Sequence, residues 1–147
     1  MAEKQRTISA RARQTAKRPA AVARWQGEVI LDVIFERGTL FLAVENLSDA
    51  PARRVSVTFD QRLLGVGGRT DVSALRLFRN IEFLAPRKAI RTFLDTSESW
   101  FERNAPTRFT ARVSYVDASG RQRGATIVHD LEIYRDIGYA ERRRGES

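Results

Sequence analysis

The alternation of apolar and polar residues at a period of two constrains the fold more than any other feature of this sequence. Residues 109–115 read FTARVSY and residues 55–59 read VSVTF, so every second side chain is apolar. Successive side chains of a β-strand point to opposite faces of a sheet, and the pattern therefore predicts strands with one buried face. Comparable runs occur at residues 29–35, 40–44, 75–77, 81–83, 90–94 and 127–133.

Turn signals separate these runs. Residues 36–39 read ERGT, residues 117–120 read DASG, and the glycine-rich residues 63–71 predict a flexible loop. Short strands separated by regular turns predict an all-β fold, namely an antiparallel immunoglobulin-like β-sandwich of about seven strands. A small closed barrel is the alternative. The clearest hairpin joins residues 109–115 to residues 127–133, and Leu131 and Ile133 are expected on its return strand.

Two less regular segments carry their own predictions. Residues 75–83 are expected to form a weaker strand that bends near Arg79. Residues 97–106, SESWFERNAP, predict a single helical turn in a connecting loop, with a serine as its cap. Trp100 and Phe101 would then either plug the open end of the sandwich or serve as exposed anchors for a partner.

The residues between two strands, 46–52 (NLSDAPA), predict the connection at which the chain leaves one sheet and enters the other. Asn and Asp side chains form hydrogen bonds with the backbone of turns, and Pro51 gives up a donor that no ladder requires. The pattern Leu40-x-Leu42-x-Val44-x-Asn46, a polar turn, Pro51-Ala52 and Val55-x-Val57 resembles bacterial immunoglobulin-like domains of the adhesion-related (CARDB-like) kind. The segment FLAPRKAIRTFL is similar to the Leu-x-Pro segment of those domains. The resemblance covers about residues 28–135 and implies a domain that binds or spaces other domains and has no active site.

Charge divides the chain. Residues 1–27 hold seven Lys or Arg against one Glu, whereas residues 28–139 hold 16 against 15. The sequence therefore predicts three parts, which are a flexible basic arm (1–27), a sandwich domain (28–136) and a short tail (137–147). The arm is expected either to be a solvated tail or to bind polyanions, nucleic acid or anionic lipid, through counterion release. Its candidate contacts are Lys4, Arg6, Arg11, Arg13, Lys17, Arg18 and Arg24.

The residues that usually carry chemistry are scarce. The chain has no cysteine and one histidine, His129, which lies in phase with apolar neighbours and is expected at the rim of the core. No spacing brings the carboxylates together, and no helix pattern follows Gly65, Gly67 and Gly68 as in a phosphate-binding loop. We therefore expect no enzyme, no cofactor, no metal and no small-molecule substrate.

The sequence favours a non-enzymatic protein-interaction or assembly module whose partner is another protein or a second copy of the chain. Its contacts are expected on loops at one end of the sandwich or at an unpaired edge strand. The candidate contacts are Arg62, Arg69, Trp100, Phe101 and Arg103. Ile30 and Ile34 make residues 29–35 apolar on both faces, as in an edge strand that is covered. Nucleic-acid or membrane association through the arm is the alternative.

A third hypothesis is a carbohydrate-binding sandwich that uses Trp100, Phe101 or Tyr139 as sugar platforms. No apolar run reaches the roughly 20 residues that span a bilayer, and no apolar stretch follows the basic N-terminus. These features predict a cytoplasmic location, with peripheral membrane association through the arm left open.

Overall fold

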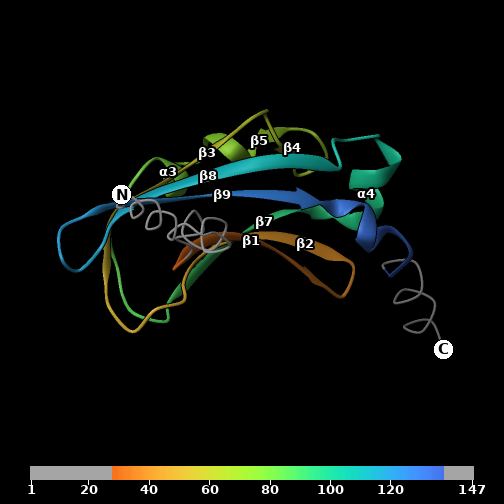
Figure 1. Ribbon diagram of the computed structural model, residues 1–147. Coiled ribbons are helices and arrows are strands. Elements are labelled where there is room, and N and C mark those ends of the chain that lie inside the picture. The colour runs from red at the N-terminus through yellow and green to blue at the C-terminus, as the bar shows by residue number, and fades with distance from the viewer. Residues whose placement is uncertain (1–27, 138–147) are drawn as a thin grey trace, which may run out of the picture.

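Two larger antiparallel sheets and one two-stranded sheet lie in the described part of the chain, which is residues 28–137 of the computed structural model (Figure 1). The three-stranded sheet has the order β1-β2-β7 and the four-stranded sheet has the order β6-β3-β8-β9. The strands of the first sheet are β1 (Val29–Glu36), β2 (Thr39–Asn46) and β7 (Ala89–Thr96). Those of the second are β6 (Ile81–Leu84), β3 (Ala52–Phe59), β8 (Arg108–Val116) and β9 (Gln122–Asp130). The prediction of an all-β sandwich with about seven strands is confirmed.

The core lies between the two sheets and is formed by the side chains that the alternation predicted. In β8, residues Phe109, Ala111, Val113 and Tyr115 are buried, and their intervening neighbours face outward. Burial of the phenol raises the pKa of Tyr115 above its ordinary value. Buried residues of the facing sheet complete the same cluster. They are Val29, Leu31, Val33, Leu40, Leu42, Val44 and Leu94.

The connection between β2 and β3 carries the chain from one sheet to the other, as predicted. Asn46 is fully buried, and its Nδ2 donates hydrogen bonds to the carbonyl oxygens of Ala50 at 2.8 Å, Leu84 at 3.3 Å and Ala85 at 3.2 Å. Its Oδ1 accepts from the backbone N–H of Ser48 at 3.0 Å. The Asn46 side chain thus forms hydrogen bonds with backbone groups of two turns. Its buried position is explained by these backbone groups and not by a reactive role.

The outer edge of β1 is covered by side chains of the same molecule. His129 Nε2 lies 2.8 Å from the carbonyl oxygen of Leu31, and the Tyr134 hydroxyl donates to the carbonyl oxygen of Val33 at 3.5 Å. The backbone N–H of Val33 donates to Asp32 Oδ1 at 2.9 Å. His129 therefore lies at the rim of the core as predicted, and these edge groups are already occupied. Burial raises the pKa of the Tyr134 hydroxyl.

The β8–β9 turn is organised by one carboxylate. Asp117 Oδ1 accepts from the backbone N–H groups of Ser119 and Arg121, each at 2.9 Å, and Oδ2 accepts from Arg123 Nε at 2.8 Å. These hydrogen bonds, with that of Arg123 the largest cause, hold the pKa of Asp117 well below its ordinary value of 3.8. Gly120 adopts a φ of +87°, which suits glycine.

Two sequence-based expectations for secondary structure were wrong. Residues 72–79 form a 3-10 helix (Val72–Ala74) and α3 (Arg76–Arg79) in place of the first half of a weak strand, because this turn buries Phe78 against β3. Strand β9 ends at Asp130, and a 3-10 helix (Leu131–Tyr134) follows. Leu131 is still buried, but Ile133 is 63% exposed.

Candidate functional site

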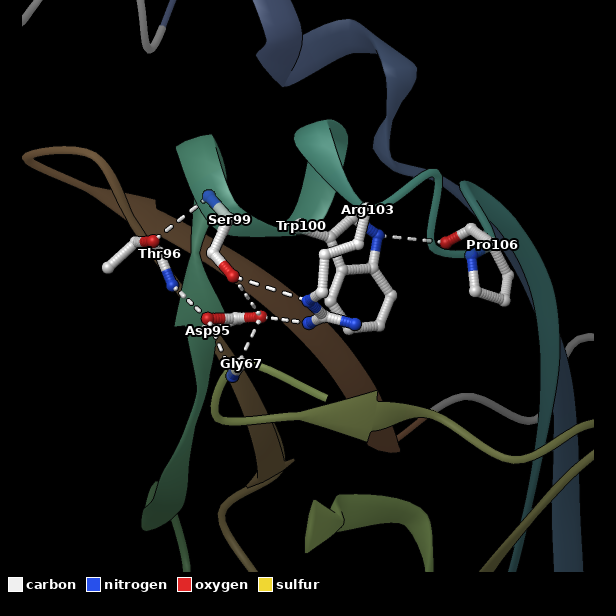
Figure 2. Close-up of polar contacts among 7 residues, drawn as sticks. All are labelled: Gly67, Asp95, Thr96, Ser99, Trp100, Arg103 and Pro106. Atoms are coloured by element: carbon white, nitrogen blue, oxygen red, sulfur yellow. Dashed lines mark hydrogen bonds and ion pairs between the residues drawn. The ribbon is translucent and has the colours of Figure 1, made fainter. Parts of the chain in front are cut away.

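The end of the sandwich that carries the predicted partner contacts is organised by α4 (Ser97–Glu102). The helix cap is Thr96 and not a serine of the segment, since Thr96 Oγ1 accepts from the backbone N–H of Ser99 at 3.1 Å. Trp100 points into the core and is fully buried, and its Nε1 donates to the carbonyl oxygen of Pro106 at 2.9 Å (Figure 2). The plug interpretation of Trp100 is therefore the correct one.

A buried carboxylate, Asp95, fixes the loops around this helix. Figure 2 shows its two oxygens between Gly67 of the glycine-rich segment, the N-terminus of α4 and the guanidinium of Arg103. The backbone N–H of Gly67 donates to both oxygens at 3.3 Å, and the backbone N–H of Thr96 donates to Oδ1 at 2.8 Å. The Ser99 hydroxyl donates to Oδ2 at 3.2 Å, and the Arg103 guanidinium pairs with the same oxygen. Both oxygens have donors from three segments, so this carboxylate serves as a structural clamp.

The glycine-rich segment is a clamped hairpin, which corrects the expectation of a flexible loop. It contains β4 (Leu64–Gly65) and β5 (Thr70–Asp71). The backbone N–H of Val66 donates to the carbonyl oxygen of Leu94 at 2.8 Å. A Cβ on Gly65 would lie 2.1 Å from that oxygen, so only glycine permits this approach to β7. Since the N–H of Gly67 points at Asp95, it is not presented to a phosphate.

Most of the predicted partner contacts are engaged inside the fold. Trp100 is buried, and the side chain of Arg103 is 27% exposed while it holds Asp95. Phe101 is half-buried with the Arg135 guanidinium 4.4 Å from its ring centre. Only Arg62 and Arg69 of the predicted set are exposed, and this end of the sandwich offers no aromatic anchor among those residues. The prediction was wrong for Trp100 because its indole packs inward.

The same geometry removes two of the three expected sugar platforms. A sugar stacks on an exposed ring face, and neither Trp100 nor Phe101 offers a free one. Tyr139 lies outside the described residues. The candidate polyanion contacts also lie outside them. They are Lys4, Arg6, Arg11, Arg13, Lys17, Arg18 and Arg24.

An apolar surface that the loop-based prediction missed lies on the outer face of the three-stranded sheet. Ile34 of β1 is paired with Phe41 of β2, and Phe41 is paired with Phe93 of β7. These three side chains, which we call the apolar row, cross the whole sheet on its outer side. The rings of Phe41 and Phe93 are 6.3 Å apart in an edge-to-face arrangement, and Phe93 is 40% exposed. The one sequence signal was the double apolar character of residues 29–35.

Charged residues surround the apolar row. The Arg91 guanidinium lies 4.3 Å from the ring centre of Phe41 and forms an ion pair with Glu36 at 3.1 Å. Asp32 and Glu45 lie on the same outer face, because Asp32 pairs with Ala43 and Glu45 with Ile30. The face thus carries three carboxylates against one guanidinium, and its local charge is negative.

The outer face of the four-stranded sheet has a different composition. Its central strands present Ser56, Thr58, Thr110 and Arg112, with Ser56 paired with Ser114 and Thr58 with Arg112. Its exposed apolar side chains, Phe83 at 54% and Val128 at 52%, lie on the two edge strands, β6 and β9. They are separated by two strands and form no continuous patch.

Neither metal ligation nor a membrane-spanning helix is found among residues 28–137. No group of three or more His, Asp or Glu side chains in this part of the chain converges on a common point. None of its helices combines the length and the apolar character needed to cross a bilayer.

Fold and surface together define an antiparallel β-sandwich domain with a row of apolar side chains on the outer face of one sheet. The chain belongs to the family described as "Domain of unknown function (DUF8453)", whose model matches residues 2–135. No curated protein matches the chain.

Proposed function

We propose that this protein is a non-enzymatic protein-interaction or assembly module that binds another protein across the outer face of its three-stranded sheet. The observation that carries the proposal is the apolar row, in which Ile34, Phe41 and Phe93 are consecutive cross-strand neighbours. Contiguous exposed apolar side chains mark interaction sites more often than isolated ones do. Aromatic residues are also enriched in the buried centres of interfaces.

The charges beside the apolar row specify the partner that would fit. Three carboxylates, on Asp32, Glu36 and Glu45, lie on the face with a single guanidinium, on Arg91. A partner with apolar anchors flanked by basic side chains would match both properties. A second copy of the chain is the competing occupant. Sedimentation of the isolated chain distinguishes the two possibilities, because only the second copy would make the isolated chain a dimer.

Binding to the face is preferred over pairing with the β1 edge. The carbonyl oxygens of Leu31 and Val33 accept from His129 and Tyr134, and the N–H of Val33 donates to Asp32. An incoming strand would have to displace these contacts. The face requires no such displacement, because its side chains already point outward.

Affinity capture with a matched pair of variants tests the proposal. Phe93→Ser removes the most exposed member of the apolar row, which is 40% exposed, and Val128→Ser removes an apolar side chain that is 52% exposed on the other sheet. Wild type and the Val128 variant should recover the same stoichiometric protein, and the Phe93 variant should lose it. Recovery that is equal for all three forms would refute the proposed surface.

A second candidate function is polyanion binding through residues 1–27, which hold seven cations against one carboxylate. Affinity for DNA, RNA or anionic vesicles that falls steeply with salt and is lost on deletion of residues 1–24 would select it. The resemblance to CARDB-like domains, the absence of enzymatic activity and the cytoplasmic location remain predictions that accompany the main proposal.

A further inference from the structure

A groove runs along the C-terminal half of β3 on the outer face of the four-stranded sheet. Two open hollows of about 430 and 610 Å³ are neighbours here, and both have Thr58 and Phe59 in their linings. Volumes in this range are typical of small-ligand sites. The groove lies on the sheet opposite to the apolar row, so it is independent of the proposed protein-binding surface.

Three arginines from three different segments line this groove, which we call the arginine groove. Arg62 follows β3, Arg79 ends α3, and Arg112 lies on β8 opposite Thr58. Neither Arg79 nor Arg112 forms an ion pair with a carboxylate of residues 28–137. Arg62 has its nearest carboxylate, Asp71, at 3.8 Å.

One carboxylate also lines the groove, and it is already engaged. Asp60 Oδ1 accepts from the backbone N–H of Thr110 at 3.1 Å and from Gln61 Nε2 at 3.5 Å. Three guanidinium groups against one carboxylate leave the groove positive. The cations flank it from both sides, since Arg112 lines one hollow and Arg62 and Arg79 line the other.

The side of β3 beneath the groove is packed against the core and rigid. The ring of Phe59 lies 5.1 Å from that of Phe78 and 5.9 Å from that of Phe109, and both of these rings are buried. Ser56 and Thr58 add hydroxyl groups to the lining. Forked guanidinium donors with neighbouring hydroxyls match the oxygens of a phosphate group.

We infer that the arginine groove binds a small ligand with two or more phosphate groups. The phosphates would lie between Arg79 and Arg112, and Arg62 would contact the end of the ligand nearest the clamped hairpin. A nucleoside polyphosphate and inorganic pyrophosphate share this chemistry. They differ in the nucleoside, which only the former carries.

Titration of the full chain with pyrophosphate and with ATP at low ionic strength tests the inference. The double variant Arg79→Gln/Arg112→Gln should weaken both affinities at least about tenfold, because each arginine contributes charge-assisted hydrogen bonds. The control Arg76→Gln/Arg121→Gln removes the same charge from exposed positions outside the groove and should change affinity less than about twofold.

A second readout distinguishes the groove from the basic residues 1–27. Amide resonances of Thr58 and Thr110 should shift and saturate as pyrophosphate is added. Equal losses in both double variants, no loss in either, or shifts confined to residues 1–27 would each overturn the inference. None of these outcomes bears on protein binding at the apolar row, so each proposal can fail without the other.

Discussion

The outer faces of the two sheets differ in a way that separates their uses. The three-stranded sheet presents Ile34, Phe41 and Phe93 as neighbours across all its strands. The four-stranded sheet presents hydroxyls and Arg112 in its middle, with its exposed apolar side chains on opposite edges. Both faces have the same strand geometry behind them, so the difference lies in the outward-facing residues alone.

The two outer faces meet the general requirements of a sheet surface to different degrees. An outward-facing position in a sheet needs only β-propensity and solubility, and Thr, Ser and Arg meet that need on the four-stranded sheet. Phenylalanine at two adjacent outward positions serves neither solubility nor the core. This difference is consistent with the two proposals, in which the first face binds a protein and the second binds a small anionic ligand.

The comparison of the two faces would lose its meaning if the loop end of the sandwich were the true binding surface. Trp100→Ala tests this possibility and is expected to have the largest effect on stability. Because Trp100 is fully buried and hydrogen-bonded to Pro106, its loss should lower the free energy of unfolding by about 3–5 kcal/mol. Urea denaturation measures the change. Unaltered stability would mean that the indole is a contact residue after all.

The Asp95 clamp gives the next largest effect. Asp95→Ala leaves the Arg103 guanidinium and the N–H of Gly67 without their acceptor, and should cost about 2–3 kcal/mol. Glu102→Ala, on the exposed side of the same helix, should change stability by less than about 0.5 kcal/mol. Equal effects of the two substitutions in denaturant unfolding would show that Asp95 does not hold the hairpin.

The pH dependence of stability tests the role of Asp117 in the β8–β9 turn of the four-stranded sheet. The pKa of Asp117 is lowered in the folded state, so its contribution to stability is complete above its ordinary value of 3.8 and is lost as the pH falls toward the folded value. Unfolding midpoints measured from pH 5 to pH 2 should decline less steeply for Asp117→Asn than for wild type. Thr126→Ala, which removes no titrating group, should retain the wild-type slope. Identical slopes for all three proteins would contradict the role of Arg123 and the turn amides.

Substitutions of exposed apolar side chains, including Phe93 of the apolar row, should have the smallest effect on stability. Phe93→Ser and Val128→Ser remove exposed side chains, and each should lower the free energy of unfolding by about 1 kcal/mol or less. Thermal unfolding followed by circular dichroism measures both. A loss near that of Trp100→Ala would place Phe93 in the core and remove the distinction between the two sheet faces.

The sequence predicts those parts of the fold in which burial has a clear period. Residues 109–115 alternate over seven positions, and every predicted core residue of β8 is buried. Leu75 and Leu77 alternate over only three positions, which is too short to distinguish a strand from the helical turn that buries Phe78. The crossover at residues 46–52 could be predicted because Asn and Pro have specific uses in turns.

The site was harder to predict because it depends on register between distant strands. Phe41 and Phe93 are neighbours only because β7 pairs with β2, and no local pattern encodes that pairing. In the sequence Asp95 is one of several scattered carboxylates, and its role depends on the hairpin and α4, which meet at its side chain only in the folded chain. Trp100 could be an anchor or a plug by sequence alone, since residue type does not determine the direction of a side chain in a loop.

Site-specific photo-crosslinking in the native host tests the central claim most directly. A photoreactive phenylalanine derivative would replace Phe93 in one form and Val128 in another, with full-length chain in both. The account predicts a crosslink to one protein from position 93 and none to that protein from position 128. Crosslinks of equal yield from both positions, or from position 128 alone, would contradict it.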